Sequence, residues 1–136
     1  QGQSTSGPCS ISQAASIEAL VGPHDDVLEM VREFEKRRNV MVDQLAAIPG
    51  VSCNKPNGSF YSFPDFSDLY KKKDRNGKVI QGSLDFTEFL LTEKKVAILP
   101  GIAFGADANA RMSFATSLDK IEEGVKRIKE AVELLK

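Results

Sequence analysis

Arg111 is the residue of this sequence whose type and position most directly suggest chemistry. It stands near the start of ARMSFATS, Ala110 to Ser117, whose other residues are apolar or small and favour a strand. A guanidinium presents a planar fork of N–H donors that matches the two oxygens of a carboxylate. The residue alone leaves two interpretations open. It is either a solvated cation in a weak surface ion pair at a strand end, or an anion-binding group that faces a cleft.

Two further stretches would complete the rim of such a cleft. NGSFYSF brings Gly58 and Phe60 to the start of a strand, and LPGIAFG contains Gly101 and Gly105, which permit a close approach of backbone. An aromatic ring, a glycine-containing loop and one cation would together suit a small carboxylate. Taken one at a time, however, Phe60 fits a core position and the loop fits an ordinary turn.

The sequence contains no motif of self-contained catalysis. It has no phosphate-binding loop, no nucleophile elbow and no His–Cys pair with an orienting partner. The single histidine, His24, follows Pro23 where a helix is expected to begin. The two cysteines, Cys9 and Cys53, are too few for a zinc site or a disulfide framework. We therefore expect no catalytic residue and no metal site in this chain, and reduced thiols in a cytoplasmic protein.

The composition is typical of one compact domain. The 136 residues are 41% hydrophobic and 27% charged, and the net charge is -1. No global basic field would attract nucleic acid, and no apolar run approaches the ~20 residues that span a bilayer. We expect neither nucleic-acid nor membrane partners, and a solvated Lys71–Lys73 run. The N-terminus has no signal-peptide pattern. It also has no starting methionine, from which we expect a processed piece or a fragment of a longer chain.

Apolar spacing predicts four helices. The first begins at Ser10, with Gln13 placed for a capping box, and ends near Gly22. The second is long, residues 25–48, and carries an apolar stripe with Arg38 in its one polar slot. A short helix covers LDFTEFLLTEK, and the last helix begins after Ser117 with a second long stripe.

Strands are predicted between these helices. VSCNK and SFYSF flank the turn residues PNG and indicate a β-hairpin or a close relative, and VAILP and RMSFA indicate two more strands. The order is helix, long helix, two strands, helix, two strands, helix. This order favours an α/β fold, a two-layer sandwich of a small mixed sheet with long helices.

In collinear order, these stretches resemble a known family. QSTSGPCSISQAA, EFEKRRNVMVDQL, IPGVSCNKPNGSFYSFPDF, VAILPGIAFG and ARMSFATSLDKIEEGVKRI are similar to the C-terminal part of class I/II aminotransferases. These are fold-type I enzymes dependent on pyridoxal phosphate (PLP). The resemblance is strongest to the bacterial-type aspartate/prephenate aminotransferase group. It covers almost the whole chain and implies the C-terminal small domain of such an enzyme.

The resemblance implies roles for individual residues. In this family, an arginine that opens an R-x-S-x-A strand binds the substrate α-carboxylate, and Arg111 takes that place. Phe60, in the family's G-x-F-Y element, would lie near the substrate. Contacts that line the site or reach a neighbouring subunit are implied for Gly58, Gly101, Ser4 and Ser6. The resemblance also implies a homodimer with active sites at the interface.

The resemblance further indicates what the chain lacks. The family's Schiff-base lysine and most groups that bind PLP lie upstream of the stretches resembled. The cofactor would therefore be bound by a missing large domain, and this chain alone would be inactive. We expect residues 1–24 to be the tail of that large domain, residues 25–48 a long interdomain helix, and residues 49–136 the C-terminal small domain.

The implied reaction moves an amino group between an amino acid, of aspartate or glutamate type, and a 2-oxo acid. Two other interpretations stay open. In the first, the chain is a stand-alone, non-catalytic α/β module that binds a partner or a small carboxylate. In the second, it is part of an enzyme with another fold-type I PLP chemistry. The residues that select the reaction and the substrate side chain are mostly upstream, so aspartate, prephenate and aromatic substrates are not distinguished.

Overall fold

The computed structural model describes Ser4 and residues 6–136. It divides into two compact units, Gln1–Arg32 and Glu33–Lys136. In the first unit, helix α1 (Ser10–Val21) has no buried residue. Helix α2 (Asp25–Ala46) begins with two acidic residues, which favour a helix N-terminus through the macrodipole. The predicted domain assignment of residues 1–24, 25–48 and 49–136 stays a prediction.

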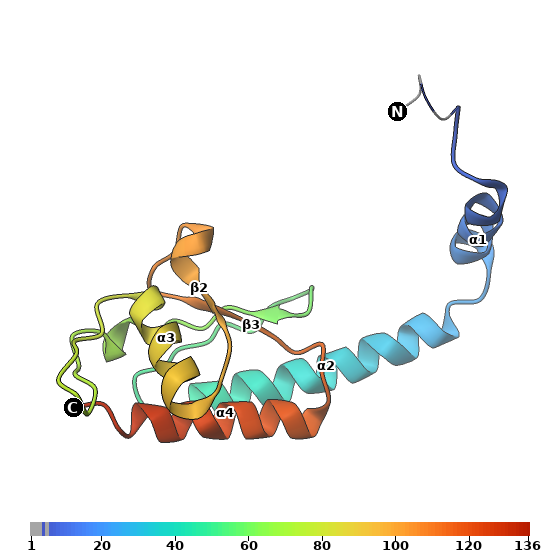
Figure 1. The fold of residues 1–136 in the computed structure, drawn as a ribbon. Coiled ribbons are helices and arrows are strands. Elements are labelled where there is room, and N and C mark those ends of the chain that lie inside the picture. Colours follow the sequence, from blue (N-terminus) through green and yellow to red (C-terminus); the bar gives the residue numbers. More distant parts are fainter. Residues whose placement is uncertain (1–3, 5) are drawn as a thin grey trace. The chain divides into compact units, whose positions relative to one another are not determined.

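The second unit combines a small sheet with helices (Figure 1). Its strands are β1 (Tyr61–Ser62), β2 (Leu99–Pro100) and β3 (Ala110–Ser113), and its helices after α2 are α3 (Ser83–Lys94) and α4 (Leu118–Val132). Two short 3-10 helices, η1 (Ser67–Leu69) and η2 (Gly101–Phe104), lie in the connections. Figure 1 shows α4 and the second half of α2 on the same side of the sheet. The predicted α/β class is confirmed.

The order of the strands corrects one detail of that prediction. The sheet has the order β1-β3-β2, and both pairs are antiparallel. The sheet is therefore antiparallel and not mixed as predicted, because β3 lies between β1 and β2 and runs opposite to each. Partners across the sheet are Tyr61 with Ser113 and Leu99 with Arg111.

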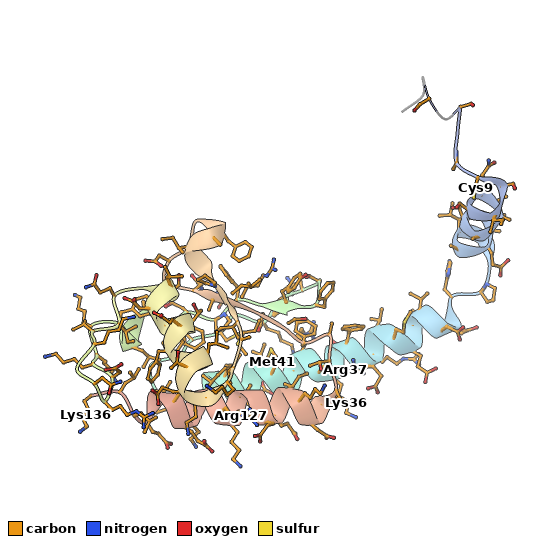
Figure 2. All side chains as sticks on the ribbon, in the orientation of Figure 1. Cys9, Lys36, Arg37, Met41, Arg127 and Lys136 are labelled. Carbon is orange, nitrogen blue, oxygen red and sulfur yellow. The ribbon has the colours of Figure 1, made fainter. Side chains whose placement is uncertain are left out.

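One hydrophobic core joins the sheet to its helices. Helix α4 buries residues at steps of three and four, as its sequence predicts: Ile121, Val125, Ile128 and Val132. Helix α2 contributes Met41 and Leu45 to the same core, and Met41 and Arg127 mark α2 and α4 in Figure 2. From β1, the buried Ser62 hydroxyl donates to Met41 Sδ at 3.0 Å. This satisfies a polar group that faces the core.

The predicted capping box at the first helix is wrong. Cys9 is the N-cap of α1 and Ser10 is already helical, so the Ser10 hydroxyl does not stand at the cap position. The Gln13 side chain instead donates to the Pro8 carbonyl at 2.8 Å.

The predicted hairpin is an open loop. Ser52 and Asp65 exchange two backbone hydrogen bonds of 3.1 and 2.8 Å, which close the base of the loop. Within this fully described stretch, the ladder does not continue toward Pro56–Gly58. Strand β1 pairs with β3 instead. None of the helices in the described part of the chain is both long and apolar enough to cross a membrane.

Candidate functional site

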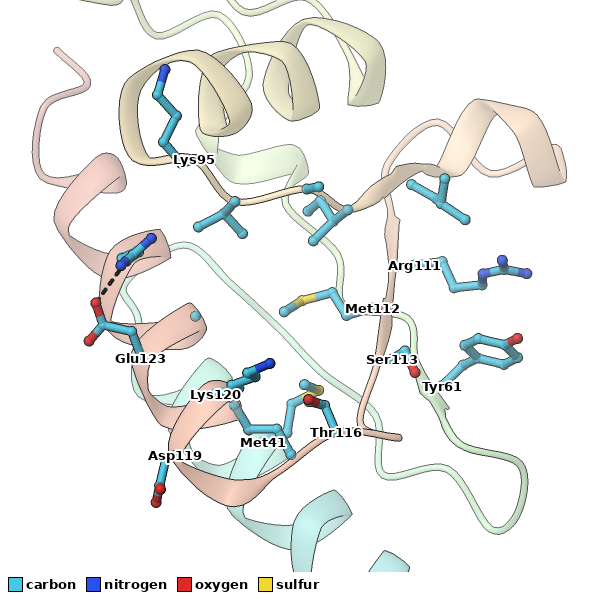
Figure 3. Close-up of a pocket in the computed structure, with 17 residues that line it drawn as sticks. Met41, Tyr61, Lys95, Arg111, Met112, Ser113, Thr116, Asp119, Lys120 and Glu123 are labelled. Atoms are coloured by element: carbon cyan, nitrogen blue, oxygen red, sulfur yellow. Dashed lines mark hydrogen bonds and ion pairs between the residues drawn. The ribbon is translucent and has the colours of Figure 1, made fainter.

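Arg111 lies on the central strand β3 and faces away from the core. Successive strand residues point to opposite faces, and on β3 the neighbouring Met112 is buried while Arg111 is half-buried. Tyr61 pairs with Ser113 and so shares the face of Arg111, one diagonal step away. Figure 3 shows the Arg111 and Tyr61 side chains beside each other, pointing away from Met112.

Two aromatic rings contact the guanidinium. Arg111 Cζ lies 4.3 Å from the centre of the Tyr61 ring and 4.5 Å from the centre of the Phe104 ring. Both distances are within the ~6 Å at which a ring attracts a cation. Tyr61 comes from β1 and Phe104 from η2, so rings from two separate elements contact the guanidinium that β3 carries. Because guanidinium groups stack on rings through their planar faces, this leaves the N–H edge for a carboxylate.

The donors of Arg111 have no anionic partner in the described part of the chain. The ion pairs found there join other cations to other carboxylates. This does not fit the interpretation of Arg111 as a surface ion pair. It leaves a half-buried cation, held by aromatic rings, whose hydrogen-bonding capacity is available to a small anion.

A tight turn carries Phe104 to this position. At Gly101, a Cβ atom would lie 2.1 Å from the Ala106 carbonyl oxygen and 2.2 Å from that of Asn109, so only glycine fits. Its amide donates to Asn109 at 2.9 Å, and the Ala106 amide donates back to Gly101 at 3.0 Å. Gly105 ends η2 with a φ of 75°, a left-handed conformation that favours glycine. The close backbone approach predicted from LPGIAFG is confirmed.

A buried serine ties this turn to helix α3. Asp107 Oδ1 accepts hydrogen bonds from the Ser83 amide at 2.9 Å and the Ser83 hydroxyl at 2.7 Å. The Ser83 hydroxyl in turn accepts from the Ile102 amide at 3.1 Å. Hydrogen bonds from the Ser83 hydroxyl, and then from its amide, lower the pKa of the Asp107 carboxyl. Sequence reasoning missed Asp107, whose loop position gave no signal.

Comparison with known proteins adds the family. The sequence model described as "Aminotransferase class I and II" matches residues 1–128 of the 136. This chain belongs to the class I and II aminotransferases. The resemblance predicted from the sequence is thereby confirmed.

Curated relatives of this aminotransferase chain are much longer than it is. The "Probable aspartate/prephenate aminotransferase" of Rickettsia felis is 45% identical over 131 residues, which are 96% of this chain and 32% of the relative. The "Aspartate aminotransferase" of Rhizobium meliloti is 42% identical over 135 residues, 99% of this chain and 33% of the relative. The chain therefore spans about a third of the length of these relatives.

Solved structures agree with the family. The aspartate aminotransferase structure from Rhizobium meliloti superposes with a TM-score of 0.94 at 41% identity, covering 99% of this chain and 34% of that one. An alanine aminotransferase structure from Pyrococcus furiosus superposes with a TM-score of 0.79 at 26% identity, covering 93% and 30%. The predicted fold class is that of these neighbours.

The remaining predicted site residues of the aminotransferase chain lie in two places. Phe60 is 42% exposed and is therefore not a core residue; its ring centre lies 4.3 Å from that of Tyr61, next to Arg111. Gly58 is exposed, with open space where a Cβ would stand. Ser4 and Ser6 belong to the first unit and are exposed. The roles implied for these residues stay predictions.

A pocket of about 750 Å³ lies beside β3 in the aminotransferase chain. Much of its wall is apolar, with Met41, Ile98 and Met112, and α4 adds the Glu123–Arg127 ion pair of 2.7 Å (Figure 3). Arg111 and Tyr61 are also among the residues that line this pocket, and Figure 3 shows the Arg111 side chain pointing away from Met112. Within the described residues, no group of His, Cys, Asp and Glu is arranged to hold a metal ion.

Proposed function

We propose that this chain is the C-terminal part of a PLP-dependent aminotransferase in which Arg111 binds the substrate α-carboxylate. The reaction would move an amino group between an amino acid of aspartate or glutamate type and a 2-oxo acid. The observation that carries this proposal is the guanidinium of Arg111, which contacts Tyr61 and Phe104 and has no anion partner in the described residues. The relatives at 42–45% identity, an aspartate/prephenate and an aspartate aminotransferase by name, support the aspartate type.

The contribution of this chain would be orientation. A two-point hydrogen bond from a guanidinium fixes the plane of a carboxylate and thus the direction of the bonds at the adjacent carbon. Phe60, half-exposed beside Tyr61, would cover the substrate from water. Gly58 and Gly101 would line the same rim.

We propose PLP as the cofactor and place its site in the rest of the protein. The described residues fit the carboxylate end of such a site but not the cofactor, because Arg111 is surrounded by aromatic rings rather than by a lysine and phosphate-binding donors. No catalytic residue is assigned to this chain, and we expect it to be inactive alone.

The partners follow from the same proposal. They are the amino-acid and 2-oxo-acid substrates, the large PLP-binding domain of the same polypeptide, and a second copy in a cytoplasmic homodimer. Residues 1–24 would belong to the large domain, residues 25–48 to an interdomain helix and residues 49–136 to the small domain. Ser4 and Ser6 would contact the neighbouring subunit.

Kinetics of the protein expressed from its complete gene test the proposal. Arg111→Ala should lower kcat/KM for L-aspartate by at least roughly 30-fold, the effect of removing one partner of a buried, hydrogen-bonded charge pair. Arg111→Lys should also be impaired, because an ammonium does not reproduce the planar fork. The absorbance of bound cofactor should not change. Arg127→Ala, which removes a cation paired with Glu123 on α4, is the matched control.

Unchanged half-reaction kinetics in Arg111→Ala with full cofactor content would contradict the assignment. A complete gene without a large domain upstream would instead support the stand-alone module. Formation of products other than a 2-oxo acid and an aminated cofactor would support another fold-type I chemistry.

A further inference from the structure

We propose that Phe104 and Asp107 are positioning residues for Arg111. Phe104 holds the guanidinium by direct contact, and Asp107 holds the turn that carries Phe104. The inference rests on the proposed function, because it concerns the same carboxylate site, and it names the residues that set the affinity of that site.

The placement of Phe104 is not explained by burial. Its side chain is 46% exposed, and its ring meets Arg111 at 4.5 Å and the edge of Phe63 at 6.1 Å between ring centres. A long arginine side chain on an open sheet face has many rotamers. A ring against the guanidinium restricts those rotamers before the substrate arrives, so less conformational entropy is lost on binding.

Asp107 connects the two ends of the turn through one buried group. Its carboxylate accepts both donors of Ser83, and the Ser83 hydroxyl accepts from the amide of Ile102, at the start of η2. Ser83 is completely buried whereas Asp107 and Ile102 are exposed, so these hydrogen bonds are part-buried and only partly shielded from water. The turn is thereby tied to the first residue of α3.

The N-cap of α3 leaves space for this carboxylate because it is a glycine. At Gly82, the N-cap of α3, a Cβ would lie 2.5 Å from Asp107 Oδ2 and 3.0 Å from Oδ1. A negative charge at a helix N-terminus is also favoured by the macrodipole. Asp107 is therefore fitted to α3 by hydrogen bonds, by space and by charge. Through Ser83 it fixes the turn on which Phe104 stands.

Conservative and non-conservative variants separate positioning from general stability. In the holoenzyme from the complete gene, Phe104→Leu should raise KM for L-aspartate about tenfold while kcat changes less than about threefold, because a cation–π contact is lost. Phe104→Tyr keeps the ring and should stay within about twofold of wild type. Leu91→Ala on α3, 51% exposed, is the control for loss of a comparably exposed apolar side chain.

The second residue is tested in the same way. Asp107→Ala should raise KM for L-aspartate by roughly three- to tenfold, because the Ser83 hydrogen bonds are lost. Asp107→Asn keeps the Oδ1 acceptor and should restore most of the affinity. In an Arg111→Ala background, Phe104→Leu should add no further loss, since the two residues would act as one unit.

The outcomes distinguish this inference from the function on which it rests. A large loss in Arg111→Ala with a wild-type KM in Phe104→Leu overturns the positioning role and leaves the proposed function intact. Equal impairment in Asp107→Asn and Asp107→Ala overturns the role of the Oδ1 acceptor. No loss in Arg111→Ala overturns the proposed function, and the positioning role with it.

Discussion

The guanidinium of Arg38 donates a hydrogen bond of 3.2 Å to the carbonyl oxygen of Pro56. It also donates to Asn39 Oδ1 at 3.1 and 3.2 Å and pairs with Glu35 at 2.8 Å. Only 15% of the Arg38 side chain is exposed. Helix α2 thereby holds the loop that leads to Phe60 and Tyr61, so Arg38 links the core to the rim of the candidate site.

Replacing Arg38 should therefore destabilise the protein. Arg38→Ala should lower the free energy of unfolding by about 1–3 kcal/mol, because a shielded charge-assisted hydrogen bond is lost and the Pro56 carbonyl is left unpaired. Urea denaturation measures the change. Lys36→Ala, on an exposed position of the same helix (Figure 2), should cost less than about 0.5 kcal/mol. Equal losses in the two variants would show that the Pro56 contact contributes nothing.

Local patterns predicted the helices and much of the core. The steps of three and four in the last helix place Ile121, Val125 and Ile128 on one face whatever the tertiary structure, and all three are buried. The same rule predicts the apolar stripe along residues 25–48, to which Val27 and Val31 belong, yet these two side chains are 49% and 55% exposed. Periodicity shows that a helix has an apolar face, but it does not identify what covers that face.

The candidate site was only partly predictable because its contacts are distant in sequence. Arg111 was identified from its residue type and the family pattern. Its aromatic neighbours depend on the pairing of β1 with β3 and on the turn at Gly101, which no local rule fixes. The role of Arg38 had one signal, a charge within an apolar stripe, whereas its contact with Pro56 required the folded structure.

The turn at Gly101 should not tolerate a side chain. Gly101→Ala would place Cβ against two carbonyl oxygens of the backbone, which cannot move without breaking the hydrogen bonds of the turn. We expect a loss of about 2–4 kcal/mol in the free energy of unfolding, the scale of strain in an overpacked site. Gly58→Ala is the matched control, because nothing lies within 4 Å of its Cβ position. Thermal unfolding of both variants measures the difference, and similar melting temperatures would refute the close approach.

Tyr70 should titrate far above an ordinary tyrosine. Burial, and then the charges of Asp107 and Asp65, raise its pKa to about 12, and its hydroxyl donates to the Asp107 carbonyl at 2.8 Å. Because the folded-state pKa lies above the unfolded value of ~10, the contribution of Tyr70 to stability is complete below pH ~10 and is lost as the pH rises toward 12. Tyrosinate absorbance should show a step near 12 that Tyr70→Phe lacks and Tyr61→Phe retains. If Tyr70→Phe instead removed a titration step at pH ~10, the burial of the Tyr70 hydroxyl would be contradicted.

Gly124 offers a stabilising substitution. It lies within α4, and nothing stands within 4 Å of the position that a Cβ would take. Because glycine costs a helix interior about 0.5–1 kcal/mol relative to alanine, Gly124→Ala should raise the free energy of unfolding by that amount. The melting temperature should rise by roughly 2–5 °C. The reverse change at an exposed position of the same helix, Glu122→Gly, should lower it by a similar amount. A lower melting temperature in Gly124→Ala would show that the space beside Gly124 is filled in solution.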